Sequence, residues 1–245
     1  MTTDMDDRRI RDQSLSFFAK IVAGQGHEIT NVLNIINELN GLLQDLMAGA
    51  DRSHHVNLER VKAISEKVQY QVQRGETMIR QVRAFAHSAD FPVTVFDLKT
   101  VLEQVVFLAE RHTRLSKSEL CPDFPEESTA LQCSPFALQQ AVFIAIDASL
   151  LTSTRPERIA VGYRIEQTRA RLFVGTEVAF GGEPEAEKQL AFLDELLPEL
   201  GGDLLEIPRT GQPYAVAFGL NRAAAPKADP TGPAEGEYHV IRGAS

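Results

Sequence analysis

The amino-acid sequence predicts an α+β protein. An N-terminal antiparallel helical hairpin forms a four-helix bundle in a homodimer, and an α/β sandwich follows it. Three observations support this class. Apolar residues recur at spacings of four and three before residue 90, mixed periodicities follow Pro92, and a chain of 245 residues that is 43% hydrophobic has room for about two cores. We expect a hairpin over residues 1–90, a second domain over 91–221 and a disordered tail over 222–245.

The first helix is predicted from an unbroken row with 4-3 spacing, as in the seam of a supercoiled helix pair. Its members are Phe18, Val22, Gln25, Ile29, Val32, Ile36, Leu39, Leu43 and Leu46. Glycine and short polar residues predict a turn over Ala48–His55. A second helix is predicted from a periodic run that ends before Pro92, comprising Val61, Ile64, Val68, Val72, Ile79, Val82 and Phe85.

The apolar stripe of the first helix is wider than one partner helix can cover, because Ile21, Ile35 and Leu42 form an additional row. Two hairpins packed as a four-helix bundle would cover it, so we predict a homodimer through residues 10–88. The alternative is that the hairpin packs on the second domain of its own chain.

The second domain is predicted to alternate helices and strands. Asp97 and Ser134 are suited to cap two helices, and Pro135 suits a first helical position. The expected order after residue 97 is a helix over 98–111, a Pro- and Glu-rich loop over 122–128, a short strand, a helix over 136–151, strands over 158–165 and 171–178, a helix over 185–200, and strands over 203–207 and 214–220. This order indicates helices on one face of a mixed sheet.

Composition excludes several classes of function. The formal net charge of −9 argues against nucleic acid as a partner, because phosphate binding needs a basic surface. No apolar run reaches the length of a membrane span and the N-terminus is too charged for a signal peptide, so we expect a cytoplasmic protein without membrane contact. Cys121 and Cys133 lack metal or disulfide spacing and are expected to be reduced packing residues.

His27 is the candidate for chemistry. If Val22 is at heptad position a, His27 is at f, opposite the seam, and must face solvent. Gly24 costs the helix about 1 kcal/mol relative to alanine, as does Gly26, which indicates close approach of another molecule. Glu28 is adjacent, and Asn31 lies one turn further on the exposed face, as does Asn34. An exposed imidazole beside an acid and amides suits phosphoryl transfer, whereas the alternative is a solvated surface histidine.

The run GHEITNVL, residues 26–33, resembles the H-box of the dimerisation and phosphotransfer domain of two-component histidine kinases. The resemblance implies that His27 is the phosphoacceptor, that Glu28 assists transfer and that Asn31 supports dephosphorylation of a response regulator. The later segments VFDL (95–98), LQQ (138–140) and LGGDL (200–204) are similar to the frame of the kinase ATP-binding domain, so the resemblance covers residues 10–221.

The nucleotide motifs of that family are missing. In that family, nucleotide binding needs an asparagine-bearing helix, an Asp-x-Gly-x-Gly turn and a glycine-rich lid. Here only Asp147 stands near the asparagine positions, and Gly175–Gly182 reads GTEVAFGG. The acidic residues that follow, Glu183, Glu185 and Glu187, would repel a triphosphate. We expect a degenerate domain without ATP, while an unusual nucleotide site at Glu177 and Gly181–Gly182 is the alternative.

The leading hypothesis is therefore a phosphorelay histidine phosphotransferase. It exchanges a phosphoryl group between a receiver-domain aspartate and His27, has response-regulator phosphatase activity, and uses magnesium brought by the receiver with no cofactor bound stably of its own. The alternatives are a non-catalytic pseudokinase scaffold that binds response regulators and a soluble histidine kinase with a divergent ATP site. The other histidines, among them His87 and His112, are interpreted as structural or solvated.

Overall fold

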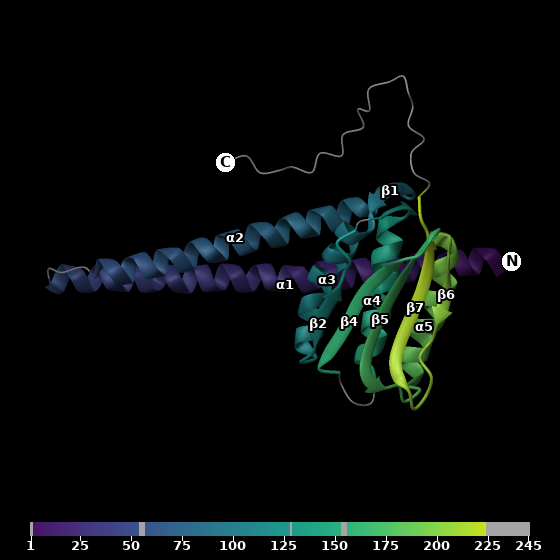
Figure 1. Ribbon diagram of the computed structural model, residues 1–245. Helices are drawn as coiled ribbons and strands as arrows, with labels where there is room; N and C mark the ends of the chain where they lie inside the picture. The colour runs from purple at the N-terminus through teal and green to yellow at the C-terminus, as the bar shows by residue number, and fades with distance from the viewer. Residues whose placement is uncertain (1, 54–56, 128, 153–155, 224–245) are drawn as a thin grey trace, which may run out of the picture.

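The computed structural model describes residues 2–53, 57–127, 129–152 and 156–223. Its elements, in chain order, are α1 (Thr2–Ser53), α2 (Leu58–Ser88), β1 (Thr94–Asp97), α3 (Leu98–Leu115), β2 (Glu119–Asp123), β3 (Ala130–Cys133), α4 (Pro135–Leu150), β4 (Arg158–Ile165), β5 (Arg169–Ala179), α5 (Pro184–Leu196), a 3₁₀ turn η1 (Leu197–Leu200), β6 (Gly202–Glu206) and β7 (Pro213–Asn221). The predicted fold class, a helical hairpin followed by an α/β sandwich, is confirmed (Figure 1).

The long helices α1 and α2 run antiparallel, and the far half of the hairpin projects away from the sandwich (Figure 1). The turn predicted over Ala48–His55 needs correction, because α1 continues to Ser53; residues 54–56 lie outside the described chain. A single glycine costs about 1 kcal/mol, which does not end a helix that is already formed, because each further residue adds a hydrogen bond. The Asn57 side chain accepts a hydrogen bond from the Arg60 amide at 3.0 Å and starts α2.

The main sheet has five strands in the order β2-β4-β5-β7-β6. β2 and β4 are parallel and the other neighbours are antiparallel, which confirms a mixed sheet. Helices α3, α4 and α5 cover one face (Figure 1), where alternate residues of β4 and β7 such as Val161, Tyr163 and Phe218 are buried. β1 and β3 form a separate antiparallel pair.

Several predicted caps are confirmed. The Asp97 carboxylate accepts a hydrogen bond from the Thr100 amide at 2.7 Å, and the Ser134 hydroxyl accepts one from the Ala137 amide at 3.2 Å. Gly201 ends the helical region in a left-handed conformation with φ of 66°, which a side chain would disfavour. β2 was not predicted, since its sequence ELCPD neither alternates nor avoids proline.

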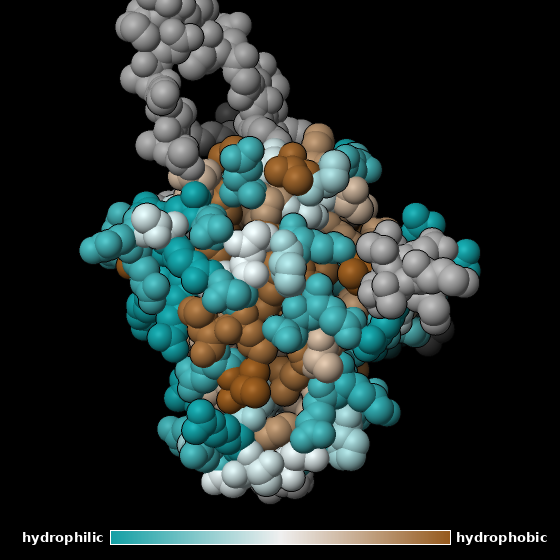
Figure 2. Space-filling view, turned by 90° about the vertical axis from the view of Figure 1, so that its right-hand side faces the viewer, coloured by the Kyte–Doolittle hydropathy of each residue, from teal (hydrophilic) through white to brown (hydrophobic). Residues whose placement is uncertain are grey.

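The end of the sandwich carries an apolar area. Figure 2 shows this end from the β6 side of Figure 1, with apolar residues gathered in the middle and hydrophilic residues around them. β6 is the edge strand here. Leu205 in this strand is 42% exposed, and Ile207, which follows the strand, is 55% exposed. Directly after β7, the backbone amides of Arg222 and Ala223 donate to the Thr168 and Ala130 carbonyls, so the first two residues of the predicted tail are held in place. Residues 224–245, the rest of that predicted tail, lie outside the described residues.

Candidate functional site

His27 lies on the exposed side of α1 near the point where the hairpin leaves the sandwich. Its side chain has no hydrogen bond or ion pair with any residue of the described chain. At 100° per residue, Asn31 lies about 40° from His27 around the helix, and it is also exposed. The buried stripe of α1, which includes Phe17, Ile21 and Val32, faces another way. An imidazole in this position is open to a partner.

The helix around His27 has bare backbone. A methyl group added to Gly24 would meet no atom within 4 Å, and the same holds for Gly26. Packing among the residues that the structure describes therefore does not require glycine at either position. The Thr30 hydroxyl donates to the Gly26 carbonyl at 2.9 Å, and α1 is continuous through both glycines. The predicted reason for them, approach of another molecule, stays a prediction.

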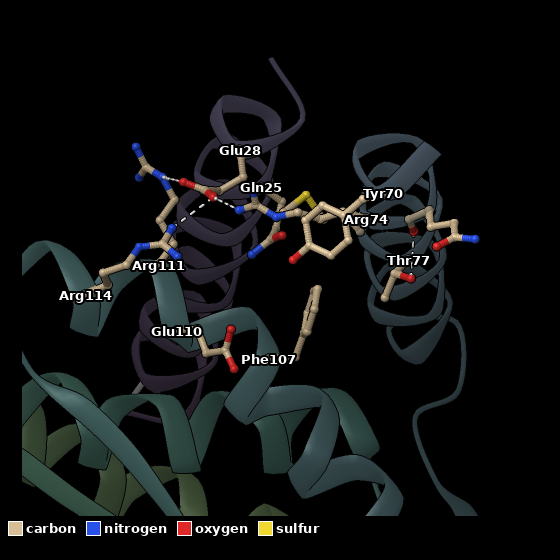
Figure 3. A pocket seen from close by; sticks show the side chains of 11 residues that line it. Gln25, Glu28, Tyr70, Arg74, Thr77, Phe107, Glu110, Arg111 and Arg114 are labelled. Atoms are coloured by element: carbon tan, nitrogen blue, oxygen red, sulfur yellow. Dashed lines mark hydrogen bonds and ion pairs between the residues drawn. The ribbon is translucent and has the colours of Figure 1, made fainter. Parts of the chain in front are cut away.

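Glu28 follows His27 and lies about 100° further around α1, and its side chain enters the junction between the hairpin and α3 (Figure 3). Three arginines surround its carboxylate, whose side chain is only 9% exposed. Arg74 of α2 donates to Oε2 at 3.0 Å, Arg111 of α3 donates to Oε1 at 3.2 Å, and Arg114 of α3 lies 2.9 Å from Oε2. The structure thus does not bring Glu28 to the His27 imidazole.

Gln25 has a different neighbour from the one that its place in the heptad row indicates. It is 3% exposed, and its Nε2 donates to the Leu108 carbonyl of α3 at 3.3 Å. The N-terminal third of α1 accordingly packs on the second domain of its own chain through Phe17 and Ile21, which contact the sandwich core. This is the alternative that the sequence left open, and it holds for this part of the helix.

Asp147 of α4 is enclosed by polar partners from three elements. Lys20 of α1 and Gln189 of α5 each donate to Oδ2 at 2.9 Å, and His112 of α3 bonds Oδ1. Burial raises the pKa of Asp147, but the hydrogen bonds and positive charges of His112 and Lys20 outweigh it and lower this pKa from 3.8 to about 2. The carboxylate is therefore ionised and already satisfied within the chain.

The segment predicted to replace the family's adenine turn is a strand. β5 runs through Gly175 to Ala179 and pairs with β7, with an irregular register between those two residues. Lys20 and Gln189 both bond Oδ2 of Asp147 and His112 bonds Oδ1, so both carboxylate oxygens have partners within the chain. The cavity of about 370 Å³ beside Asp147 is also bordered by α1, through residues such as Arg9 and Lys20.

Sequence reasoning missed the three arginines around Glu28. They are 46 residues or more away from it along the chain, and arginine is common on exposed helix faces. A weak signal was present in α3, where Arg111 and Arg114 are spaced i, i+3 and so share one helix face. Among the other histidines, His87 bonds Asp90 at 3.0 Å, and His112 bonds Asp147 as described. Cys121 and Cys133 are both unpaired thiols.

The solved structures to which the chain is similar are histidine kinases. Acinetobacter baumannii AdeS shares 16% identity, with 79% of this chain and 98% of that chain covered and a TM-score of 0.45. A histidine kinase from Burkholderia phymatum shares 14% identity, with 79% of this chain and 99% of that chain covered and a TM-score of 0.46. ThkA, solved in complex with the response regulator TrrA, shares 17% identity, with 91% of this chain and 67% of that chain covered and a TM-score of 0.44.

No protein-family model matches the chain, and no curated protein matches it. The interpretation of residues 26–33 as an H-box stays a prediction. In the described ranges of the chain, none of the helices combines the length and apolar character needed to cross a membrane.

Proposed function

We propose that this chain is a two-component phosphorelay protein that exchanges a phosphoryl group between a receiver-domain aspartate and His27. The observation that carries the proposal is the combination at one place of an exposed imidazole, bonded to no other described residue, and a helix backbone that carries no side chain at Gly24 and Gly26. A flat receiver surface can approach such a helix closely. The H-box resemblance of residues 26–33 supports the same assignment.

The chemistry is a direct displacement. The unprotonated ring nitrogen of His27 attacks phosphorus of the receiver's aspartyl phosphate, a nitrogen–phosphorus bond forms, and the bond from phosphorus to the aspartate oxygen breaks. The electron pair leaves with the aspartate as a carboxylate, and the other ring nitrogen carries the proton until solvent removes it. The divalent cation belongs to the receiver. Asn31, exposed on the same side, would position a water for dephosphorylation.

ATP is not the donor in this proposal. The support is the state of Asp147, whose carboxylate is satisfied by Lys20, His112 and Gln189, and the strand β5 in place of a glycine-rich turn. A nucleotide would have to break the Lys20 contact between α1 and α4 to reach this helix. No phosphoryl step is therefore routed through ATP.

The active form in this proposal is a homodimer. The far side of α1 from the sandwich keeps apolar side chains in contact with water, with Leu15 at 67% exposure, Val22 at 38% and Leu33 at 55%. On α2, Ile79 is 50% exposed. A second hairpin would bury these residues in a four-helix bundle and leave His27 outside. Sedimentation equilibrium of the full chain tests this, and a monomer at all concentrations would contradict it.

The decisive experiment offers two phosphoryl donors separately. The purified chain is incubated with labelled ATP or with a labelled phosphorylated receiver, in wild type, His27→Ala and the exposed-histidine control His87→Ala. We expect label from the receiver only, on wild type and His87→Ala. Absence of transfer from receivers that label other phosphotransferases would refute the proposal, and label from ATP would establish a kinase instead.

A scaffold function has one observation in its favour. Glu28, the residue expected to assist transfer, is engaged by Arg74, Arg111 and Arg114 and is not beside His27. A scaffold would bind a receiver without accepting phosphate. In that case His27→Ala would bind the receiver as tightly as wild type, and neither form would become labelled.

A further inference from the structure

The arginines around Glu28 border a cavity that phosphotransfer at His27 does not use. It has a volume of about 550 Å³ and lies between the hairpin and α3 (Figure 3). Arg74 of α2 and the pair Arg111 and Arg114 of α3 stand on one side of it, with Glu28 between them. The aromatic side chains of Tyr70 and Phe107 stand on the other side. A cavity of this size can enclose a small organic molecule.

Most hydrogen-bond donors of these arginines are unused. Each guanidinium carries five N–H groups, yet within the described chain the only acceptor of Arg74, Arg111 and Arg114 is the Glu28 carboxylate. Arg74 and Arg111 are not freely solvated, because their side chains are only 31% and 26% exposed. Partly buried donors of this kind gain from an anionic acceptor with several oxygens.

The charge of the cavity also calls for an anion. Three guanidinium groups face two carboxylates, Glu28 and Glu110, which leaves an excess of positive charge. Partial burial raises the pKa of Glu110, against the opposing charges of Arg114 and Arg74. Within the described residues the Glu110 carboxylate accepts no hydrogen bond, so it can accept one from a hydroxyl or amino group of a ligand.

We propose that this cavity binds a small phosphorylated ligand that carries an aromatic ring. The phosphate oxygens bond the free N–H groups of Arg74, Arg111 and Arg114, and the ring lies against Phe107 and Tyr70, of which Tyr70 is 63% exposed and available for stacking. A phosphate monoester brings one to two negative charges, which matches the excess of the cavity. The ligand phosphate and Glu28 compete for the same guanidinium groups.

Calorimetric titration of the full chain tests the site with defined probes. Phenyl phosphate supplies both phosphate and ring, inorganic phosphate supplies the anion alone, and benzoate replaces phosphate by carboxylate. We expect phenyl phosphate to bind about tenfold more tightly than inorganic phosphate, because only it reaches the aromatic side. Equal affinities would overturn the aromatic part, tighter binding of benzoate would overturn the phosphate part, and no saturation at about 10 mM phenyl phosphate would overturn the whole site.

Variants locate the binding. Arg111→Gln should weaken the binding of phenyl phosphate at least tenfold. Arg83 is an exposed arginine of α2 outside the cavity, and Arg83→Gln should leave the affinity for phenyl phosphate unchanged. Glu28→Gln removes the competing charge and should tighten binding about tenfold. This last gain distinguishes an anion site from a purely structural cluster, and it needs no arginine to be removed. Equal affinities in Glu28→Gln and wild type would overturn the proposal. The outcome does not depend on phosphotransfer, since no receiver is present.

Discussion

Replacing Asp147 by asparagine should lower stability in a way that depends on pH. The Asp147 pKa is about 2 in the folded chain, against 3.8 as its ordinary value, and this difference corresponds to about 2 kcal/mol of folding free energy. Because the folded pKa is the lower of the two, the stabilisation is complete above pH 3.8 and is lost as the pH falls through 2. The charges responsible are those of His112 and Lys20.

Urea unfolding followed by circular dichroism measures the effect. We expect Asp147→Asn to be less stable than wild type by about 2 kcal/mol at pH 7, and by about half as much at pH 3. Asp194→Asn, at an exposed aspartate of α5, should stay within about 0.5 kcal/mol of wild type at both. If the loss for Asp147→Asn is the same at pH 7 and pH 3, shape rather than charge explains it, and the ion-pair reasoning is wrong.

Three further outcomes are expected. Gly24→Ala should raise the free energy of unfolding by about 0.5–1 kcal/mol, because its methyl group meets nothing, and should slow transfer from a phosphorylated receiver; a more stable protein with unchanged transfer would speak against close docking. Gly162→Ala should cost about 1–3 kcal/mol in urea unfolding, since its methyl group would lie 2.4 Å from the Asp123 carbonyl oxygen, and an unchanged midpoint would contradict that clash. Burial raises the pKa of Cys133 to about 12, so maleimide at pH 8 should label Cys121 and spare Cys133 in the folded chain, and mass spectrometry finding equal labelling would refute this.

Local signals in the sequence predicted most of the fold. Caps at Asp97 and Ser134 act on amides three residues away, and alternation in residues 158–165 reflects one strand with one buried face, so both could be read without knowledge of the rest of the chain. β2 escaped prediction because parallel pairing with β4 depends on a partner 39 residues later and not on its own pattern.

Of the candidate site, only the position of the exposed His27 could be predicted from the sequence. The position of His27 follows from helical geometry, because an f position faces away from any seam. Glu28 sits one residue further, and its environment is set by Arg74 and Arg111, which the tertiary fold brings from α2 and α3. No periodicity records a contact between a carboxylate and arginines on two other helices. Heptad spacing likewise gave Gln25 a place in the seam without indicating that α3 would be its neighbour.

The 52-residue helix α1 connects the two parts of the molecule mechanically as well as covalently. Lys20, anchored to Asp147, and His27 are seven residues apart, which is about 10 Å along the axis and within about 20° around it. An unbroken helix transmits rotation over such a distance almost without loss. A displacement of the sandwich that acts on Lys20, or on Arg9 through its ion pair with Glu195, is therefore expected to move His27 with it, independently of the connection over residues 89–93.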